Sequence, residues 1–336
     1  YTYVWSNGAN TQDVTGLTAG GYSVTIRDFK GCQRVVPFTI GQPNLLTGTL
    51  TATGVLCNGD ATGTLTVTPN GGTTPYTYSW QNSTTLYAVN AAILSNVIAD
   101  DYQVTVTDAK GCVYIDNETV TEPSELIVSH TFVNVRCFGG SDGSINLTVS
   151  GGSPGYSYVW KNSAGTVVGA GMNLIDVPAE TYDAVITDSK GCTKTLIQEI
   201  TQPPLPISVT ETITHVKCFG ENTGVIDLAV SGGTPPYSYS WTTGQNTAVI
   251  NGLIAQTYKY TVIDSKSCRD SNSVIITQPA QPLTITSIVK DANCFGDSNG
   301  GIDLTVSGGT SPYYYEWENS SYVLSTTGQD LVNYPS

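Results

Sequence analysis

The 336-residue chain has 13 Lys and Arg residues against 27 Asp and Glu residues, which gives a formal net charge of −14. Such a surface repels nucleic acid and anionic membranes, so we expect neither as a partner. Charged residues are only 12% of the chain, glycine occurs 35 times and tyrosine 20 times, which is typical of an all-β protein with many tight turns. No run of about 18 apolar residues occurs, so we expect no membrane insertion.

An aromatic motif, Pro-Tyr-x-Tyr-x-Trp in its fullest form, recurs five times and contains every tryptophan of the chain. The copies end at Trp5, Trp80, Trp160, Trp241 and Trp317. Self-similarity at a period near 80 residues predicts a tandem array of one small module. We number the modules repeats 1 to 5: a partial repeat at 1–43, complete repeats at 44–123, 124–203 and 204–282, and a partial repeat at 283–336. Because the chain starts and stops inside a repeat, we expect it to be a slice of a longer polypeptide.

Each repeat boundary carries Gln or Glu followed by proline. The four boundaries are Gln42-Pro43, Glu122-Pro123, Gln202-Pro203-Pro204 and Gln278-Pro279. Proline interrupts strand pairing, and the connections are too short to act as flexible linkers. We therefore expect semi-rigid stacking of neighbouring repeats.

Within a repeat, apolar and polar residues alternate with period two. In repeat 3 the segment Ser144–Val149 alternates, Gly151-Gly152 predicts a turn, and Tyr156, Tyr158 and Trp160 then share one face of the next strand. We interpret this face as the core of the module, in preference to a sugar-stacking platform.

A second signature closes each repeat: a tyrosine leads a strand into an Asp-x-Lys-Gly-Cys turn, with Ser267 in place of glycine in repeat 4. The tyrosines are Tyr22, Tyr102, Tyr182 and Tyr258, and they resemble the tyrosine corner of Greek-key sandwiches. No segment shows a 3.6-residue period. We therefore predict an all-β fold, with each repeat an Ig-like or PKD-like antiparallel sandwich of about seven short strands. The four tyrosines and the five tryptophans are the predicted structural core.

Eight cysteines occur at regular spacing, which predicts a disulfide framework and an oxidising, extracytoplasmic location. They are Cys32, Cys57, Cys112, Cys137, Cys192, Cys218, Cys268 and Cys294. One alternative pairs cysteines within a repeat, as in Cys57–Cys112. The other pairs them across each boundary: Cys32–Cys57, Cys112–Cys137, Cys192–Cys218 and Cys268–Cys294. We prefer the second, because the two cysteines within a sandwich would lie at opposite poles, beyond disulfide reach.

The sequence offers no catalytic, cofactor-binding or metal-binding set. The two histidines, His130 and His215, occupy non-equivalent positions, and no nucleophile or phosphate-loop motif is present. Ser141-Asp142-Gly143 and Asp297–Gly300 resemble the start of a calcium loop but lack its spaced acidic ligands. We therefore expect no enzyme activity and no cofactor, and calcium at these turns stays open as the less favoured alternative to turns formed by local hydrogen bonds.

A long string, Cys-Phe-Gly-x-x-x-Gly-x-Ile-x-Leu-x-Val-Ser-Gly-Gly-x-x-Pro-Tyr-x-Tyr-x-Trp, is present at Cys218–Trp241 and at Cys294–Trp317. It resembles the SprB repeat of Bacteroidota surface proteins. Gly155, where the motif usually has proline, and Ser267 depart from this pattern locally. The resemblance implies a large cell-surface adhesin, associated with the outer membrane, exported by type IX secretion and in some members moved during gliding.

On this basis we expect the repeats to form a semi-rigid stalk or filament. Regions outside this chain would contact surface polysaccharide, substratum or other cells, and the repeats themselves would offer lateral or homotypic self-association. Two alternatives stay open: glycan-binding repeats that use the variable loops, and an accessory region of a secreted enzyme.

Overall fold

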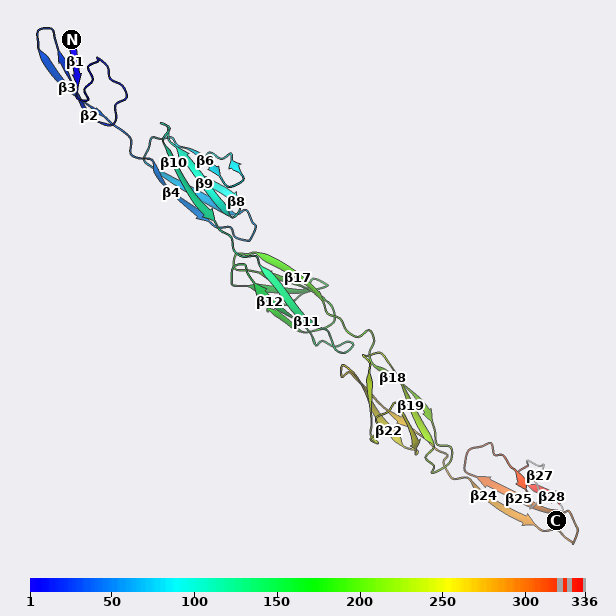
Figure 1. Cartoon of the computed structure of the whole chain (residues 1–336). Coiled ribbons are helices and arrows are strands. Elements are labelled where there is room, and N and C mark those ends of the chain that lie inside the picture. The colour runs from blue at the N-terminus through cyan, green and yellow to red at the C-terminus, as the bar shows by residue number, and fades with distance from the viewer. Residues whose placement is uncertain (319–322, 325–327, 335–336) are drawn as a thin grey trace. The chain divides into compact units, whose positions relative to one another are not determined.

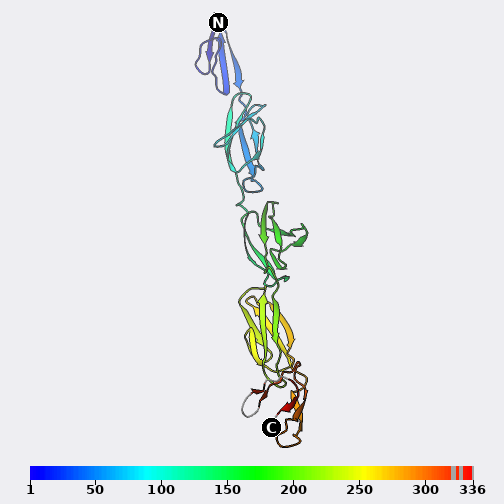
Figure 2. The same ribbon diagram turned by 90° about the vertical axis from the view of Figure 1, so that its right-hand side faces the viewer.

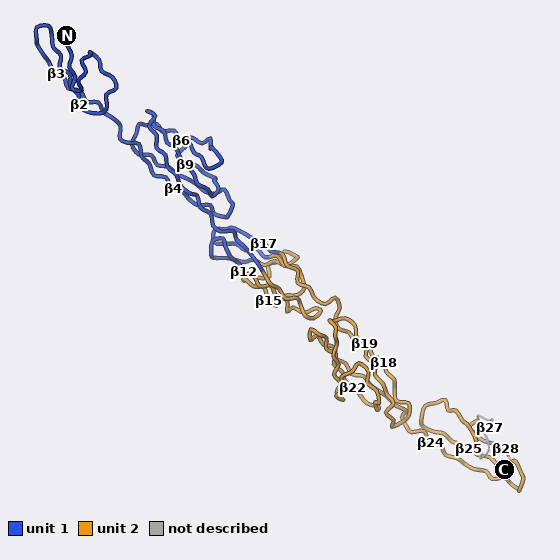
Figure 3. Tube along the Cα trace, in the orientation of Figure 1, with its two compact units in different colours: residues 1–129, 148–159, 184–196 blue, residues 130–147, 160–183, 197–336 orange. Residues whose placement is uncertain are grey.

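The computed structural model describes residues 1–318, 323–324 and 328–334. Every regular element within these residues is a β-strand, and Figures 1 and 2 show arrows and loops without helical ribbon. The predicted all-β fold is therefore confirmed. The chain divides into two compact units, residues 1–129, 148–159 and 184–196, and residues 130–147, 160–183 and 197–336 (Figure 3), and each is described by itself.

The strands of repeats 1 and 2 lie in the first unit. Those of repeat 1 are β1 (Thr2–Trp5), β2 (Gly20–Arg27) and β3 (Gln33–Ile40). Those of repeat 2 are β4 (Thr47–Thr53), β5 (Gly63–Asn70), β6 (Thr77–Gln81), β7 (Leu86–Tyr87), β8 (Ile93–Val97), β9 (Asp100–Thr107) and β10 (Val113–Val120).

The remaining strands belong to repeats 3, 4 and 5. Those of repeat 3 are β11 (Ile127–Val133), β12 (Gly143–Ser150), β13 (Ser157–Asn162), β14 (Val167–Gly169), β15 (Asn173–Val177), β16 (Thr181–Thr187) and β17 (Thr193–Glu199). Those of repeat 4 are β18 (Ser208–Thr214), β19 (Gly224–Ser231), β20 (Tyr237–Trp241), β21 (Val249–Leu253), β22 (Thr257–Asp264) and β23 (Arg269–Ile275). Those of repeat 5 are β24 (Thr284–Lys290), β25 (Gly300–Ser307), β26 (Trp317–Glu318), β27 (Val323–Leu324) and β28 (Leu331–Tyr334).

Repeat 2 is a sandwich of two antiparallel sheets, with strand orders β4-β5-β8 and β10-β9-β6-β7. Alternation turns Leu65 and Val67 of β5 inward, and they meet Trp80 of β6 and Val104 and Val106 of β9 in one fully buried cluster. This order is that of an immunoglobulin-like Greek key, because the chain passes between the sheets after β5, β7 and β8.

Repeats 3 and 4 repeat this plan. Their sheet orders are β11-β12-β15 with β14-β13-β16-β17, and β18-β19-β21 with β20-β22-β23. In repeat 4, Trp241 lies opposite Tyr260 in the β20–β22 pair, with ring centroids 5.5 Å apart. The cores of repeats 2 and 4 therefore each lie between the two sheets of the repeat.

Among the described residues, repeat 1 contains one sheet of the sandwich, and repeat 5 contains one sheet and a two-stranded part of the other. Repeat 1 has β1-β2-β3, equivalent to the sheet with the aromatic strand, and repeat 5 has β24-β25-β28, equivalent to the opposite sheet, with a separate β26-β27 pair. Inward-facing positions are consequently uncovered: Ile40 is 38% exposed where its equivalent Val120 is 1%, and Leu283 is 57% exposed where Leu46 is 6%.

Candidate functional site

The Asp-x-Lys-Gly-Cys turn forms a rigid hairpin at the pole where the chain enters each repeat. In repeat 2, one carboxylate oxygen of Asp108 accepts the N–H groups of Lys110 and Cys112, each at 2.8 Å, and the other accepts that of Thr73 at 2.9 Å. Asp188 and Asp264 make the equivalent three bonds. All three carboxylates are buried. Each hairpin is thus anchored by a carboxylate whose hydrogen-bonding capacity is used locally.

In repeats 2 and 3 these hydrogen bonds favour the ionised form of the carboxylates of Asp108 and Asp188. Around Asp108, burial raises the pKa, but the N–H donors of Cys112, Thr73 and Lys110 outweigh it and hold the pKa below its usual range. For Asp188 the N–H group of Ser153 is the largest cause, and the pKa is again lowered against the effect of burial.

The loop after the first strand, which carries the other cysteine, lies at the opposite pole, where the chain leaves the repeat. In repeat 2, Val55 donates its N–H to the carbonyl of Thr121 at 2.9 Å, and Gly59 donates to a carboxylate oxygen of Glu122 at 2.8 Å. Gln202 accepts from Gly139, and Gln278 from Gly220, in the same way. Sequence reasoning missed this role of the Gln or Glu before the boundary proline, although its recurrence was the available signal.

Two disulfides connect the exit pole of one repeat to the entrance hairpin of the next. Cys57 of repeat 2 bonds to Cys192 of repeat 3, and Cys137 of repeat 3 bonds to Cys268 of repeat 4, each with a Cα–Cα distance of 5.6 Å. Their sequence separations are 135 and 131 residues. The first disulfide lies within one compact unit and the second within the other.

Both pairing schemes considered from the sequence are therefore wrong. The preferred pairs Cys32–Cys57, Cys112–Cys137, Cys192–Cys218 and Cys268–Cys294 do not form, and neither does the within-repeat set. The within-repeat set fails for the stated reason, that its cysteines lie at opposite poles. The preferred set fails because each of its pairs joins an entrance hairpin to the exit pole of the following repeat. All eight cysteines lie among the described residues, and Cys32, Cys112, Cys218 and Cys294 are free and exposed.

Polar contacts surround each disulfide. At the first junction Lys194 pairs with Glu125 at 3.1 Å, and a cavity of about 440 Å³ is lined by these two residues and the disulfide. At the second junction Arg136 pairs with Asp142, and this guanidinium lowers the pKa of the Asp142 carboxyl. Asp142, in the turn that resembles the start of a calcium loop, therefore pairs its carboxylate with an arginine.

The predicted aromatic residues divide according to the sheets available to cover them. Trp80, Trp160, Trp241, Tyr102, Tyr182 and Tyr258 are buried in complete repeats, whereas Trp5, Trp317 and Tyr22 are half-buried in the partial ones. Each indole N–H donates to a backbone carbonyl, as Trp160 does to Gly171 at 2.8 Å. Each of the four tyrosines donates its hydroxyl to the carbonyl four residues earlier, as in a tyrosine corner.

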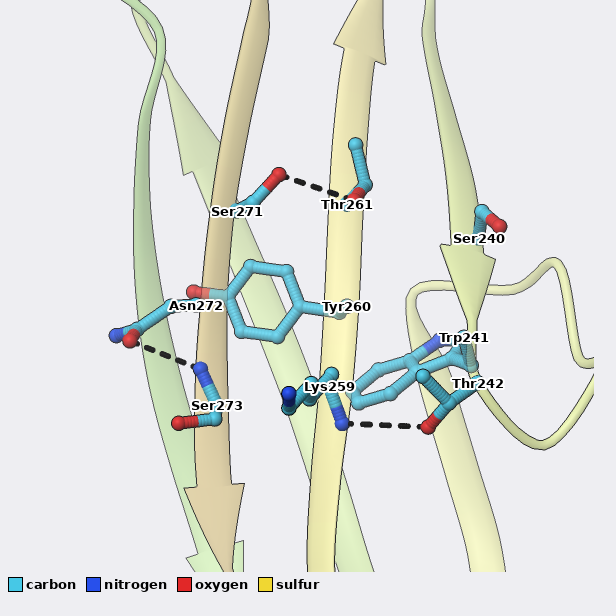
Figure 4. Close-up of a pocket in the computed structure, with 9 residues that line it drawn as sticks. All are labelled: Ser240, Trp241, Thr242, Lys259, Tyr260, Thr261, Ser271, Asn272 and Ser273. Atoms are coloured by element: carbon cyan, nitrogen blue, oxygen red, sulfur yellow. Dashed lines mark hydrogen bonds between the residues drawn. The ribbon is translucent and has the colours of Figure 1, made fainter.

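A polar hollow of about 460 Å³ lies on the aromatic sheet of repeat 4 (Figure 4). Its lining includes the hydroxyls of Thr261 and Ser271, which share a hydrogen bond of 2.9 Å, and Lys259. The nearby rings of Trp241 and Tyr260 are only 4% and 3% exposed. The pKa of Tyr260 lies well above its usual range. Burial is the largest cause, and the hydrogen bond from its hydroxyl to Glu211 is the next. The hollow therefore lacks the exposed ring on which a sugar would stack.

No group of three or more His, Cys, Asp or Glu side chains suited to a metal ion occurs within the described part of the chain. His130 contacts the side-chain oxygen of Gln198 at 2.7 Å, and His215 accepts the N–H of Thr277 at 3.2 Å. Across the same described residues, no helix has the length and hydropathy needed to cross a bilayer.

The sheets and their junctions define a class: a tandem array of immunoglobulin-like β-sandwiches in which disulfides join neighbouring repeats. The family model of the SprB repeat matches four stretches at the expected period, residues 49–85, 129–165, 210–246 and 286–321. The chain belongs to the SprB-repeat family.

Solved structures to which the chain is similar contain immunoglobulin domains. For the N-terminal eight Ig domains of Down Syndrome Cell Adhesion Molecule, the TM-score is 0.29 at 11% identity, over 97% of this chain and 61% of that one. For the N-terminal four Ig domains of Dscam1 isoform 6.9, the TM-score is 0.24 at 14% identity, over 82% of this chain and 90% of that one. For extracellular domains 3–5 of Drosophila OTK, the TM-score is 0.28 at 11% identity, over 69% of this chain and 92% of that one. The chain thus spans less than two thirds of the first of these structures, and no curated protein matches it.

Proposed function

We propose that this chain is a structural and adhesive repeat region of an extracellular or cell-surface protein, in which tension passes between repeats through disulfides as well as through the backbone. The observation that carries the proposal is the bonding of Cys57 to Cys192 and of Cys137 to Cys268, each across one repeat boundary. Disulfides persist in oxidising compartments, which supports a location outside the cytoplasm. The repeats supply length and stiffness and carry out no catalysis.

The finer part of the proposal follows the family. SprB-repeat membership supports a surface adhesin of a Gram-negative bacterium that is associated with the outer membrane, exported by type IX secretion and used in gliding. We propose residues 44–123, 124–203 and 204–282 as the complete units of its stalk or filament. Contact with polysaccharide, substratum or other cells would then fall to regions beyond these repeats.

Single-molecule force spectroscopy of the 336-residue chain tests the mechanical role. With both disulfides intact, the shortest covalent path from Cys57 to Cys268 is the segment of about 55 residues between Cys137 and Cys192, which extends to about 180–200 Å. After reduction the path is roughly 210 residues and extends to about 700–750 Å. We therefore expect the extension between residues 57 and 268 to increase nearly fourfold when reductant is added, and the total extension of the chain to increase about twofold, because the segments before residue 57 and after residue 268 extend in both cases.

The double variant Cys57→Ser, Cys192→Ser provides the matched control. It retains Cys137–Cys268, so the path from residue 57 runs along about 80 residues to Cys137 and extends to about 260–290 Å, an intermediate value. Equal extension with and without reductant would show that the disulfides do not carry force, and absence of separate unfolding events would contradict the modular stalk.

The competing hypothesis is that the repeats themselves hold glycans. A glycan array with the intact chain separates the two: robust binding supports the variable loops as lectin sites, and no binding supports the stalk. The buried positions of Trp241 and Tyr260 favour the second outcome. An accessory role beside a catalytic domain would require such a domain in the same gene.

A further inference from the structure

The two inter-repeat disulfides differ in their exposure to solvent. Cys57 and Cys192, which form the first, are both half-buried. In the second, Cys137 is half-buried, but Cys268 is only 7% exposed. A reagent in solution therefore reaches both cysteines of the first disulfide but only one cysteine of the second.

An open cavity adjoins the first disulfide. It has a volume of about 440 Å³, and both Cys57 and Cys192 line it, together with Asp60, Glu125 and Lys194. Since one water molecule takes up about 30 Å³ of liquid, this cavity has room for a thiol of a few non-hydrogen atoms beside the sulfur atoms.

The cavity near the second disulfide has a different lining. Its volume is about 520 Å³, and two cationic side chains, Arg136 and Lys266, line it. Neither Cys137 nor Cys268 belongs to this lining. This cavity therefore does not bring a small thiol to the second disulfide.

The charges around the first cavity favour one class of thiol. Glu125 pairs with Lys194 at 3.1 Å, so these two charges offset each other. Asp60 is exposed, and no basic side chain pairs with it among the residues that the structure describes. A carboxylate acts on other charges within about one Debye length, which is about 10 Å at 0.1 M ionic strength. The cavity therefore attracts a thiol that carries an ammonium group and repels an anionic thiol.

We propose that the Cys57–Cys192 disulfide is a thiol-exchange site, which a small thiol with an ammonium group opens in preference to Cys137–Cys268. Opening it removes the disulfide between repeats 2 and 3 and leaves the one between repeats 3 and 4 closed. The shortest covalent path from residue 57 to residue 268 then lengthens from about 55 to about 80 residues. The inference rests on the geometry of the junctions and not on the adhesive role, so either can fail without the other.

The reaction consumes two external thiols. The first, as its thiolate, attacks the Cys57 sulfur: a bond forms between these two sulfur atoms, the bond to Cys192 breaks, and the released Cys192 thiolate takes up a proton. The second thiolate attacks the external sulfur of this mixed disulfide and releases the Cys57 thiolate, which is then protonated. The protein disulfide is reduced by two electrons, and the two external thiols are oxidised to one disulfide.

Timed reduction of the intact chain tests the order of opening. The four free cysteines are first blocked with N-ethylmaleimide, and the protein is then exposed to 2-aminoethanethiol. Samples are stopped with isotopically heavy N-ethylmaleimide, and new thiols and mixed disulfides are located by mass spectrometry. We expect Cys57–Cys192 to open at least about tenfold faster than Cys137–Cys268, because solvent reaches both of its cysteines. Equal rates, or faster opening of Cys137–Cys268, would overturn the proposal.

A comparison of two thiols tests the charge preference. 2-Aminoethanethiol and the anionic 2-mercaptoethanesulfonate are compared at equal thiolate concentration, at ionic strengths of about 10 mM and about 1 M, where the Debye length is about 30 Å and about 3 Å. At the lower ionic strength we expect the first thiol to open Cys57–Cys192 roughly threefold faster, and at the higher one we expect no difference. Equal rates at both ionic strengths would contradict the assigned class of thiol.

Asp60→Lys separates the charge of the cavity from that of the whole chain, and we expect it to reverse the preference between the two thiols. Glu221→Lys is the matched control, because Glu221 donates its N–H to the Cys218 carbonyl as Asp60 does to the Cys57 carbonyl. Both positions are exposed, and circular dichroism checks that both variants keep the fold. The control should leave the preference unchanged. An equal effect of the two substitutions would show that net charge, and not the cavity, selects the thiol.

Discussion

Single residues decide the backbone path at the entrance pole, where two glycines precede the aromatic strand. Gly151 and Gly152 have φ angles of +72° and +60°, which residues with a side chain rarely adopt. A Cβ at Gly151 would lie 1.8 Å from the carbonyl oxygen of Glu125. The same turn presents the N–H of Ser153 to Asp188, so the hairpin depends on it.

We predict that Gly151→Ala destabilises the protein more than Gly191→Ala. Both positions have positive φ, which costs about 1–2 kcal/mol for an L-residue, but a Cβ at Gly191 meets nothing within 4 Å. Ser267, with φ of 69°, already occupies the position equivalent to Gly191 in repeat 4. Urea unfolding of both variants measures the difference, and equal losses would show that the close approach to Glu125 is relaxed without cost.

The nine aromatic residues predicted to form the core illustrate what alternation can and cannot predict. It assigns Trp160 and Tyr182 to one face each, and both are buried. It cannot provide the acceptors of their polar atoms, because the carbonyls of Gly171 and Pro178 reach them only after the chain has turned. Nor does alternation distinguish Trp5 from Trp160. It places each on one face of its strand, but whether a second sheet covers that face depends on other strands.

At the scale of elements, the hairpin between β16 and β17 links stability to pH. The lowered pKa of Asp188 means that its stabilising contribution is fully present above the unfolded pKa, near 3.9, and is lost as the pH falls through the folded value. We predict that the protein loses stability below about pH 4, and that Asp188→Asn loses less over the same range because it has no charge to titrate.

Urea unfolding at several pH values from 6 to 2 measures this effect. Other carboxylates with lowered pKa, such as Asp108, titrate in both proteins, so the difference between the two profiles isolates Asp188. At neutral pH the variant should be the less stable protein. Parallel profiles would contradict the assigned role.

The cysteine pairing shows where spacing along the chain is misleading. Cys32 and Cys57 are close in sequence, but β3 and β4, of 8 and 7 residues, both lie between them and run from one pole to the next. At strand rise this places the two cysteines tens of ångströms apart, far outside the usual Cα–Cα range of a disulfide. The pairing follows from which pole each element reaches, and this is a property of the folded repeat.

At the scale of the whole molecule, the period of the tryptophans predicted an array of β-sandwiches, and the strands bear this out. What the period could not predict is how consecutive modules are joined, because each junction uses groups from both sides, such as Gly59 with Glu122 and Cys57 with Cys192. The repeat boundaries proposed from the prolines await tests on separate repeats.

Limited digestion with trypsin tests the covalent organisation. Lys110, Lys161 and Lys217 all lie between Cys57 and Cys268, so cleavage there produces fragments. We predict that protein cleaved once at one of these lysines stays near 35.5 kDa on a gel without reductant and separates into two fragments only when reduced. Cleavage before Cys57 or after Cys268 releases a terminal peptide with or without reductant, so the fragments are identified by mass spectrometry. Release without reductant of a fragment that ends at Lys110, Lys161 or Lys217 after a single cleavage would contradict the two inter-repeat disulfides.

The two loops closed by the disulfides share residues 137–192, and this overlap determines how many backbone cuts the chain tolerates. Cys57 with Cys192 forms one covalent node and Cys137 with Cys268 another, and the backbone connects these nodes three times, through residues 57–137, 137–192 and 192–268. Continuity of the chain therefore survives a cut in any two of the three connections. A surface protein exposed to foreign proteases can in this way be nicked repeatedly and still hold its two ends together.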